Sequence, residues 1–224
     1  MKKKLILMCI AGALVMTAVI GGTLAGFNTE TKSKAVTDIK VNTLGIDMLG
    51  DSDSEEPDAT TKADGKDIKV VPGGDTVIQH NIKNDVEGGY DLYTRVTIDK
   101  KWADSKKENV SLDPEKIRVY AGTDDSKQEL LAGVTVNDWI VWYSDAEQIV
   151  MYYTKPLASG ETTANFIDSL SFATDMNNDY ADEKVELAFS ADAVQVIAAE
   201  DSIPSEWGVY PEFNENGEIT KIVE

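Results

Sequence analysis

Two runs of alternating residues in the middle of the chain limit its fold more strictly than any other feature. The first run sets Thr76, Ile78, His80 and Ile82 against Val77, Gln79, Asn81 and Lys83. The second run follows a turn over 84–89 and alternates in the same way from Tyr90 to Asp99. A period of two residues over this length is typical of a half-buried antiparallel strand. The sequence therefore predicts two long antiparallel strands over 75–99, the first of them entered through the Pro72-Gly73-Gly74-Asp75 turn.

Shorter β-rich segments with turn residues between them continue on both sides of this pair. We expect strands within 35–49, 116–121, 130–136, 139–143, 148–154, 166–173, 184–199 and 219–223. No segment has the periodicity of a long helix, and no internal repeat or glycine-rich phosphate loop is present. Seven or more short strands of this kind predict an all-β fold, an antiparallel β-sandwich with acidic loops.

Aromatic residues gather in the segment that we expect to form a hairpin around residues 144–147. They are Trp139, Trp142, Tyr143, Tyr152 and Tyr153. Aromatic pairs across two strands stabilise a hairpin, and we expect that role here. The alternative is a carbohydrate-binding surface that uses Trp139, Trp142 or Trp207.

The N-terminus has the order of a secretory signal peptide. Three lysines at 2–4 precede an uncharged apolar run over 5–20, and Thr23-Leu24-Ala25 offers small residues to a peptidase. We predict cleavage after Ala25, which makes Gly26 the first residue of the mature protein. The apolar run is also about as long as the ~20 residues of a membrane span, so retention as an anchor is the alternative.

The charge of the chain excludes one class of partner. The formal net charge is −19, and loss of a leader with three lysines and no acidic residue makes the mature chain more negative. Nucleic-acid binding requires many phosphate contacts from Lys and Arg, so we expect no nucleic-acid partner. Cys9, inside the apolar run, is the one cysteine, so the mature chain has no thiol for a disulfide or a cysteine-based metal site.

The residues that could bind metals form no convincing motif. His80 is the one histidine, and a His-Glu-x-x-His zinc site needs two. We expect it to lie beside the sheet core. Acidic residues at 51–55 and 175–186 have some of the spacing of a calcium loop but lack its central glycine. We therefore predict no cofactor, with calcium as the weaker alternative, and no enzymatic activity.

Three stretches of the chain resemble the TasA/camelysin family of exported Gram-positive proteins. They are GGTLAGFNTETKSKA followed by NTLGIDML, then DIKVVPGGDTVIQHNIKNDVEGGYDLYTRVTID, then YYTKPLASGETT. The chain departs from the family pattern at Gly26-Phe27-Asn28, where two aromatics are usual, and at 42–47. The resemblance implies a jelly-roll-like sandwich, export through a SipW-type signal peptidase, and a biofilm or extracellular-matrix fibre. Some camelysins have been classed as metallopeptidases.

These observations predict four parts of the chain: a signal peptide over 1–25, an N-terminal segment over 26–40, a β-sandwich over 41–199 and an acidic C-terminal tail over 200–224. We expect a secreted or cell-surface structural protein that meets the membrane only during export. Its expected partners are further copies of itself, the SipW-type peptidase, and matrix or cell-wall components. The alternatives are a surface carbohydrate- or protein-binding module and a camelysin-like metallopeptidase.

The segment over 26–40 carries a hypothesis about assembly. It is mostly polar and cannot bury enough apolar surface to order by itself. A sheet edge can accept an extra strand through its unpaired backbone groups. We predict that the segment pairs with an edge of the next subunit, with Phe27, Val36 and Ile39 in apolar sites. The alternative is a disordered leader, or a segment that folds onto its own sandwich.

Overall fold

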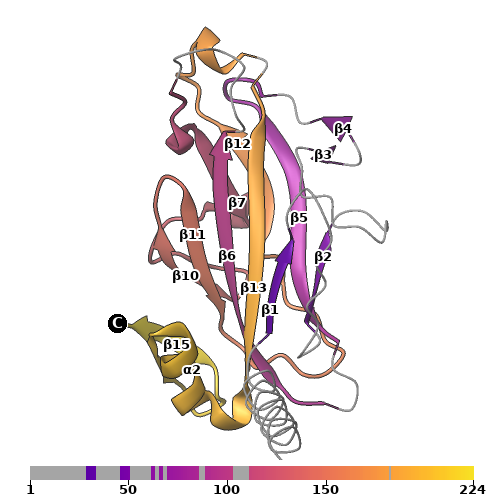
Figure 1. The fold of residues 1–224 in the computed structure, drawn as a ribbon, viewed down its shortest axis with the longest axis vertical. Coiled ribbons are helices and arrows are strands. Elements are labelled where there is room, and N and C mark those ends of the chain that lie inside the picture. The colour runs from indigo at the N-terminus through magenta and orange to yellow at the C-terminus, as the bar shows by residue number, and fades with distance from the viewer. Residues whose placement is uncertain are drawn as a thin grey trace, which may run out of the picture.

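The computed structural model describes residues 29–33, 46–50, 62–63, 66–67, 70–85, 89–102, 111–181 and 183–224. Within these residues, most of the chain lies in antiparallel strands that form two large sheets (Figure 1). In the described part, no helix is both long enough and apolar enough to span a bilayer.

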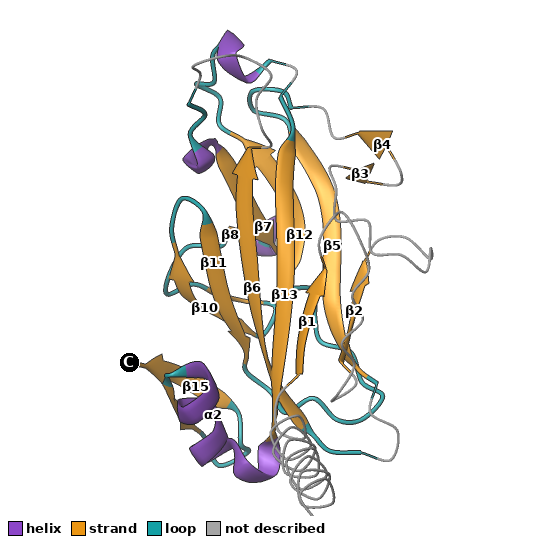
Figure 2. Ribbon diagram, in the orientation of Figure 1, coloured by secondary structure: helices purple, strands orange, loops and turns teal. Residues whose placement is uncertain are grey.

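The first large sheet has six strands and the second has five. In spatial order, the first contains β1 (Thr29–Ser33), β13 (Val185–Gln195), β6 (Leu92–Trp102), β11 (Gln148–Tyr153), β10 (Trp139–Ser144) and β9 (Thr135–Val136). The second contains β2 (Ile46–Gly50), β5 (Asp75–Asn84), β12 (Ile167–Phe172), β7 (Ile117–Ala121) and β8 (Gln128–Glu129). Figure 2 shows the two sheets lying one behind the other, and the predicted all-β antiparallel sandwich is confirmed.

Short elements connect and extend these sheets. β3 (Lys62–Ala63) pairs with β4 (Lys66–Asp67), and single 3-10 turns are η1 (Pro114–Lys116), η2 (Asp124–Ser126), η3 (Asn178–Tyr180) and η4 (Val196–Ala198). Within the described residues, these turns and one short helix are the helical structure, in agreement with a sequence that lacks helical periodicity.

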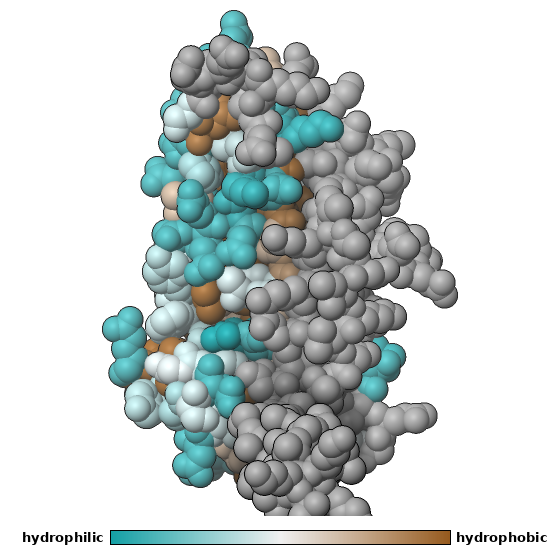
Figure 3. All heavy atoms as spheres, in the orientation of Figure 1, coloured by the Kyte–Doolittle hydropathy of each residue, from teal (hydrophilic) through white to brown (hydrophobic). Residues whose placement is uncertain are grey.

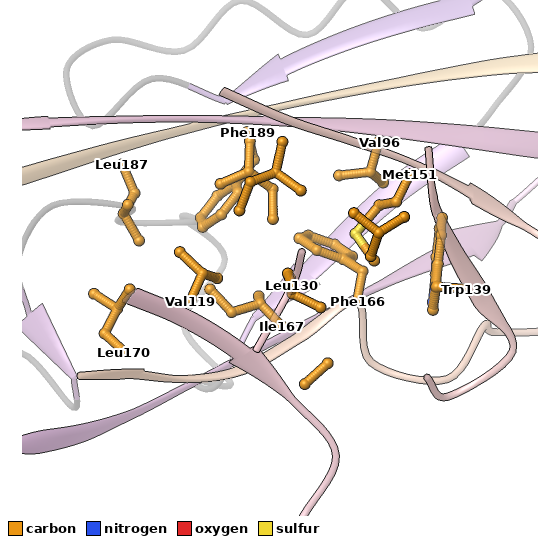
Figure 4. Packing of buried hydrophobic residues seen from close by; sticks show 14 of the residues in the cluster. Val96, Val119, Leu130, Trp139, Met151, Phe166, Ile167, Leu170, Leu187 and Phe189 are labelled. Carbon is orange, nitrogen blue, oxygen red and sulfur yellow. The ribbon is translucent and has the colours of Figure 1, made fainter. Parts of the chain in front are cut away.

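The core lies between the two sheets and is built from the alternating apolar positions. Trp139, Phe166 and Phe189 are at its centre, with Trp139 5.9 Å and Phe189 5.6 Å from the ring of Phe166 (Figure 4). Aromatic side chains bury large areas and pack edge to face at such distances. His80 lies at the border of this core, 7% exposed, with its ring 4.8 Å from that of Phe189. The alternation over 76–82 therefore marks the face of β5 that is turned toward the core.

One predicted strand is much shorter than expected. The sequence predicts a strand over 130–136, but only Thr135–Val136 form one, β9. Gly133 has a φ of +88°, and the Val134 N–H donates to the Leu131 carbonyl at 3.0 Å. This turn interrupts the strand, and glycine adopts the left-handed conformation without steric cost.

The C-terminal residues form an ordered unit rather than a plain tail. Helix α2 (Ala199–Trp207) leads through Gly208, with a φ of 70°, into the hairpin of β14 (Tyr210–Phe213) and β15 (Ile219–Val223). The hairpin strand over 219–223 was predicted, whereas α2 was not anticipated. The sequence did not predict α2 because Pro204 lies inside this nine-residue helix, and proline normally ends helices.

This C-terminal unit packs on the outer face of the six-stranded sheet (Figure 1). A second apolar cluster joins Tyr93, Val150, Tyr152 and Val194 of the sheet to Ala199, Ile203, Trp207, Val209 and Ile219 of the unit. The Tyr93 hydroxyl also donates to the Gly217 carbonyl, and the Ile219 N–H donates to the Thr154 carbonyl at 2.7 Å. Elsewhere, Figure 3 shows that the described atoms visible on this face are mostly hydrophilic, as the acidic composition leads one to expect.

Candidate functional site: the β13 edge and its N-terminal strand

The residues predicted to act in export and assembly lie outside the described residues. This applies to Thr23, Ala25 and Gly26 at the cleavage site, and to Phe27, Val36 and Ile39 of the assembly segment. The structure does describe β1, which lies inside the predicted assembly segment, between Phe27 and Val36. The site can therefore be built from β1 and the strand that it meets.

β1 pairs with β13 of the same chain, at one edge of the six-stranded sheet. The antiparallel register runs from Thr29 opposite Ala193 to Ser33 opposite Phe189. β13 itself has eleven residues and pairs with β6 along its whole length. β1 thus occupies the second, outward edge of a strand that is otherwise built into the sheet, the geometry of strand addition.

The register places polar residues of β1 opposite the core positions of β13. Thr29 and Thr31 lie opposite Ala193 and Ala191, which are both fully buried, and Ser33 lies opposite Phe189. Directly opposite residues lie on the same face of an antiparallel pair. At the register positions opposite these core residues, β1 therefore has Thr29, Thr31 and Ser33.

The outward positions of this edge carry charge. Glu30 lies opposite Asp192 in the register, and Asp192 lies opposite Arg95 of β6. Arg95 donates from Nε to the Asp192 carboxylate at 2.9 Å and also from a terminal nitrogen. The Arg95 guanidinium also lies 5.4 Å from the centre of the Trp207 ring, a cation–π contact with α2. Asp192, Arg95 and Trp207 thus connect the strand that pairs with β1 to the C-terminal unit.

The second N-terminal strand, β2, pairs with β5 at the edge of the other sheet. Ile46 lies opposite Asn84, Met48 opposite Ile82, and Gly50 opposite His80. Those three β5 residues are buried, so Ile46 and Met48 take register positions opposite residues of the core.

Two buried polar residues lie away from this edge, in the interior of the sandwich. The Asp168 carboxylate accepts from the Gly122 N–H at 2.7 Å and from the side-chain amides of Gln79 at 3.1 Å, Asn137 at 3.0 Å and Asn165 at 2.7 Å. These four bonds join β5 and β12 to three connecting segments, at Gly122, Asn137 and Asn165. They give the carboxylate the hydrogen-bond partners that a buried charge requires.

The second buried group is Lys100 of β6, which is 7% exposed. Its ammonium donates to the Ile117 carbonyl at 2.7 Å and makes a longer contact with the Pro114 carbonyl at 3.5 Å. Desolvation lowers the pKa of Lys100 from its ordinary value, opposed by Glu129, Asp145, Glu115 and Asp113. The strand pattern did not anticipate a lysine at a core position, because a lysine between two polar neighbours resembles an exposed residue.

The structure also places the residues considered for metal and carbohydrate binding. Within the described residues, no group of three or more His, Cys, Asp or Glu side chains could hold a metal ion. Asp175 forms an ion pair with Lys116 at 2.8 Å, and Asn177 accepts from the Asp179 N–H at 2.9 Å. These contacts make the 175–179 stretch a hydrogen-bonded turn.

Two aromatic residues of the predicted hairpin, Trp139 and Tyr153, face the core between the sheets. Trp139 and Tyr153 lie opposite each other in β10 and β11, with ring centres 5.1 Å apart. The Trp139 indole is fully buried and donates to the Ala164 carbonyl at 2.9 Å. Trp207 is 7% exposed, so neither tryptophan offers a free face to a sugar. Trp142 is half-buried, 6.2 Å from Tyr152.

No family model matches the chain, and no curated protein matches it.

Proposed function

We propose that this protein is an exported structural protein whose mature form assembles head to tail into a fibre, through pairing of its N-terminal segment with the β13 edge of the next copy. The observation that carries the proposal is the register of β1 on β13, from Thr29 opposite Ala193 to Ser33 opposite Phe189. A strand that pairs with its own domain at an edge can pair in the same way with the edge of another copy.

The composition of β1 favours such an exchange. A strand held by apolar anchors would be costly to remove, since each buried large side chain contributes about 1.5–3 kcal/mol. The core-side positions of β1 hold Thr29, Thr31 and Ser33, and each net backbone hydrogen bond contributes only about 0.5–1.5 kcal/mol. Release of β1 from its own chain therefore requires little free energy. Pairing of β1 with the β13 edge of the next copy recovers this free energy, because the contact is the same.

The direction of assembly follows from the contact. The donor strand and the β13 edge are different surfaces of the same chain, so the contact is heterologous and extends a filament unless it closes into a ring. Export is supported by the order of the N-terminal residues, and the resemblance to the TasA/camelysin family agrees with both parts of the proposal. The expected cellular partners remain the SipW-type peptidase and components of the matrix or cell wall.

The proposal is tested by comparing a mature chain that starts at Gly26 with one that starts at Val41. The shorter chain lacks β1 and keeps β2. We expect filaments in electron micrographs of the longer chain, and a folded monomer with intact β circular dichroism for the shorter chain. Filaments of the same form from both chains would refute strand donation by 26–40.

A peptide provides the matched control. A synthetic peptide of residues 26–40 should bind the chain that starts at Val41, because it restores the pairing with β13. The same peptide with Thr31→Pro should bind far more weakly, since proline has no N–H for the ladder and is poorly tolerated inside a paired strand. Equal binding of the two peptides would show that the contact is not a strand pairing.

A further inference from the structure

A single arginine lies among the charged positions next to the β1 edge. Arg95 is one of two arginines in the sequence, the other being Arg118. It stands opposite Asp192 of β13 on one side and opposite Tyr152 of β11 on the other. Asp192 in turn stands opposite Glu30 of β1. Because directly opposite residues share a face of the sheet, these four positions form one line across four strands, which we call the cross-strand row.

Asp192 is a charged residue in a buried place. It is 6% exposed, and Arg95 donates to its carboxylate from Nε at 2.9 Å and also from a terminal nitrogen. A buried carboxylate that loses such a partner destabilises a protein strongly. On its other side Asp192 has Glu30 at the opposite register position, and like charges at opposite positions weaken a strand pair. The charge of Arg95 therefore offsets the repulsion that an acidic strand would meet at β13.

The Arg95 guanidinium also contacts the C-terminal unit. It lies 5.4 Å from the centre of the Trp207 ring, and the Trp207 and Tyr152 ring centres are 5.4 Å apart. Arginine can stack on an aromatic ring while its planar fork bonds a carboxylate, whereas lysine is a flexible point charge. An arginine can thus contact Asp192 and Trp207 at the same time. The docked C-terminal unit supplies one of the two contacts that fix the guanidinium beside Asp192.

The charge of the chain makes this cation important for contacts between copies. The formal net charge is −19, so two copies repel each other. A contact between them forms most easily where a local cation offsets the acidic residues. Specificity also arises from unfavourable contacts with the wrong partner. A β13 edge with an uncompensated Asp192 would reject a strand with an acid at this position, whereas the edge paired with Arg95 accepts one.

We propose that Arg95 is the specificity-determining residue of the β13 edge: it offsets Asp192, so that β1 can pair there with Glu30 at the opposite position, and Trp207 of the C-terminal unit positions its guanidinium. The occupant of the edge is β1, from the same chain or from the next copy. The inference rests on the proposed function only in the second case. The C-terminal unit is then part of the acceptor site of every copy.

Hydrogen exchange of the β1 amides tests the role of Arg95, because exchange protection reports how often a paired strand opens. Glu30→Gln is introduced into the mature chain in three backgrounds: native, Arg95→Gln and Asp192→Asn. We expect it to raise β1 protection about 1.5-fold in the native chain, about 5-fold with Arg95→Gln, and not at all with Asp192→Asn. Each gain compares two chains of one background, so a general loss of stability cancels. Equal gains in the three backgrounds would overturn the proposal.

A second substitution tests the C-terminal unit and leaves the buried ion pair in place. Trp207→Leu keeps an apolar side chain in the cluster but removes the cation–π contact, so the gain from Glu30→Gln should rise to about 2–3-fold. Trp142→Leu is the matched control, since Trp142 is half-buried against the same cluster, 6.2 Å from Tyr152. With this control the gain should stay at about 1.5-fold. Equal gains with the two tryptophan substitutions would overturn the role of Trp207.

The same measurements separate this proposal from the proposed function, because β1 protection is measured in monomers and in filaments. Gains that depend on Arg95, in protein that never forms filaments, support the role of Arg95 and contradict the fibre. Filaments with equal gains in all three backgrounds overturn the role of Arg95 and leave the fibre intact. Gains that depend on Arg95 within filaments support both. Unprotected β1 amides in monomers and filaments alike would overturn both.

Discussion

The two N-terminal strands make similar contacts with different residues. β1 and β2 each have five residues, and each pairs antiparallel with the edge of a longer strand. At core-side positions β1 has Thr29, Thr31 and Ser33, whereas β2 has Ile46, Met48 and Gly50. Backbone pairing alone therefore does not distinguish them. The residue types at the register positions opposite the core differ, and under the proposed function this difference makes β1 the strand that exchanges between copies.

The outward positions continue this contrast. Glu30 of β1 lies opposite Asp192, a like charge, whereas Asp47 of β2 lies opposite Lys83, an opposite charge. Opposite charges across a strand pair stabilise it and like charges destabilise it. The register thus sets a like-charge pair on β1 against an opposite-charge pair on β2.

Removal of each strand should give the largest difference. A chain that starts at Val41 should lose less than about 2 kcal/mol of unfolding free energy, because β1 contributes little beyond backbone hydrogen bonds. A chain that starts at Asp51 also loses Ile46 and Met48, and should lose more than about 4 kcal/mol, a large part of the usual 5–15 kcal/mol. Urea denaturation of the monomers measures both, and equal losses would contradict the comparison.

Single substitutions should reproduce the contrast at a smaller scale. Met48→Ala, opposite the fully buried Ile82, should cost about 2–4 kcal/mol, the usual range for truncation of a core side chain. Thr31→Ala, opposite Ala191, should cost less than about 0.5 kcal/mol. Thr31→Val should instead stabilise the pairing of β1, because it adds apolar surface at a core-side position. A cost above 2 kcal/mol for Thr31→Ala would show that β1 is an integral strand.

The sequence predicts the sandwich well because its long strands alternate clearly. β5, β11, β12 and β13 lie within predicted segments, and β6 and β10 match theirs except that they run on to Trp102 and Ser144. The aromatic pair of Trp139 and Tyr153 lies across the predicted hairpin. In these strands, alternate residues are buried, so the sequence alternation predicts both the strand and the face that it turns to the core. Tertiary packing favours the same structure as the local pattern, and the pattern alone is therefore enough to predict it.

The same reasoning fails where tertiary contacts decide the structure. α2 contains Pro204 and has little periodicity, and it is stabilised by Ile203 and Trp207 against the sheet. Lys100 occupies a core position because the Ile117 carbonyl, distant in sequence, accepts from it. The partner of β1 is also beyond sequence reasoning, since TETKS has no apolar alternation that would select an edge.

A substitution at Lys100 tests whether β1 and the core between the sheets contribute independently to the unfolding free energy. Lys100→Met removes a buried ammonium and should raise the unfolding free energy by about 1–2 kcal/mol at neutral pH, as replacement of buried charges by apolar residues often does. The gain should be the same in chains that start at Gly26 and at Val41, because distant sites act additively. A gain that depends on β1 would show that the edge strand and the core are coupled.

The pH dependence of this gain follows from the pKa. Burial lowers the pKa of Lys100 in the folded protein, so in alkaline solution the folded state loses this proton before the unfolded state does. Wild-type stability, relative to Lys100→Met, should therefore rise with pH between the folded pKa and the ordinary lysine value. Below the folded pKa the difference should be constant. A difference that widens with rising pH would contradict the assignment.

The smallest expected effects concern the two outward charge pairs, and they should have opposite signs. Glu30→Gln removes a like charge opposite Asp192, so a 26–40 peptide with this change should bind the chain that starts at Val41 about 1.5–5-fold more tightly, which corresponds to about 0.2–1 kcal/mol. Asp47→Asn removes the attraction to Lys83 and should lower the unfolding free energy by a similar amount. The Asp192 carboxylate already accepts from Arg95, and Lys83 already contacts Asp85 at 2.8 Å, so both effects belong at the low end. Both should shrink in 1 M salt, where the screening length falls to about 3 Å. If the two substitutions change stability in the same direction, charge does not contribute to the difference between the strands, and the core-side residues alone account for it.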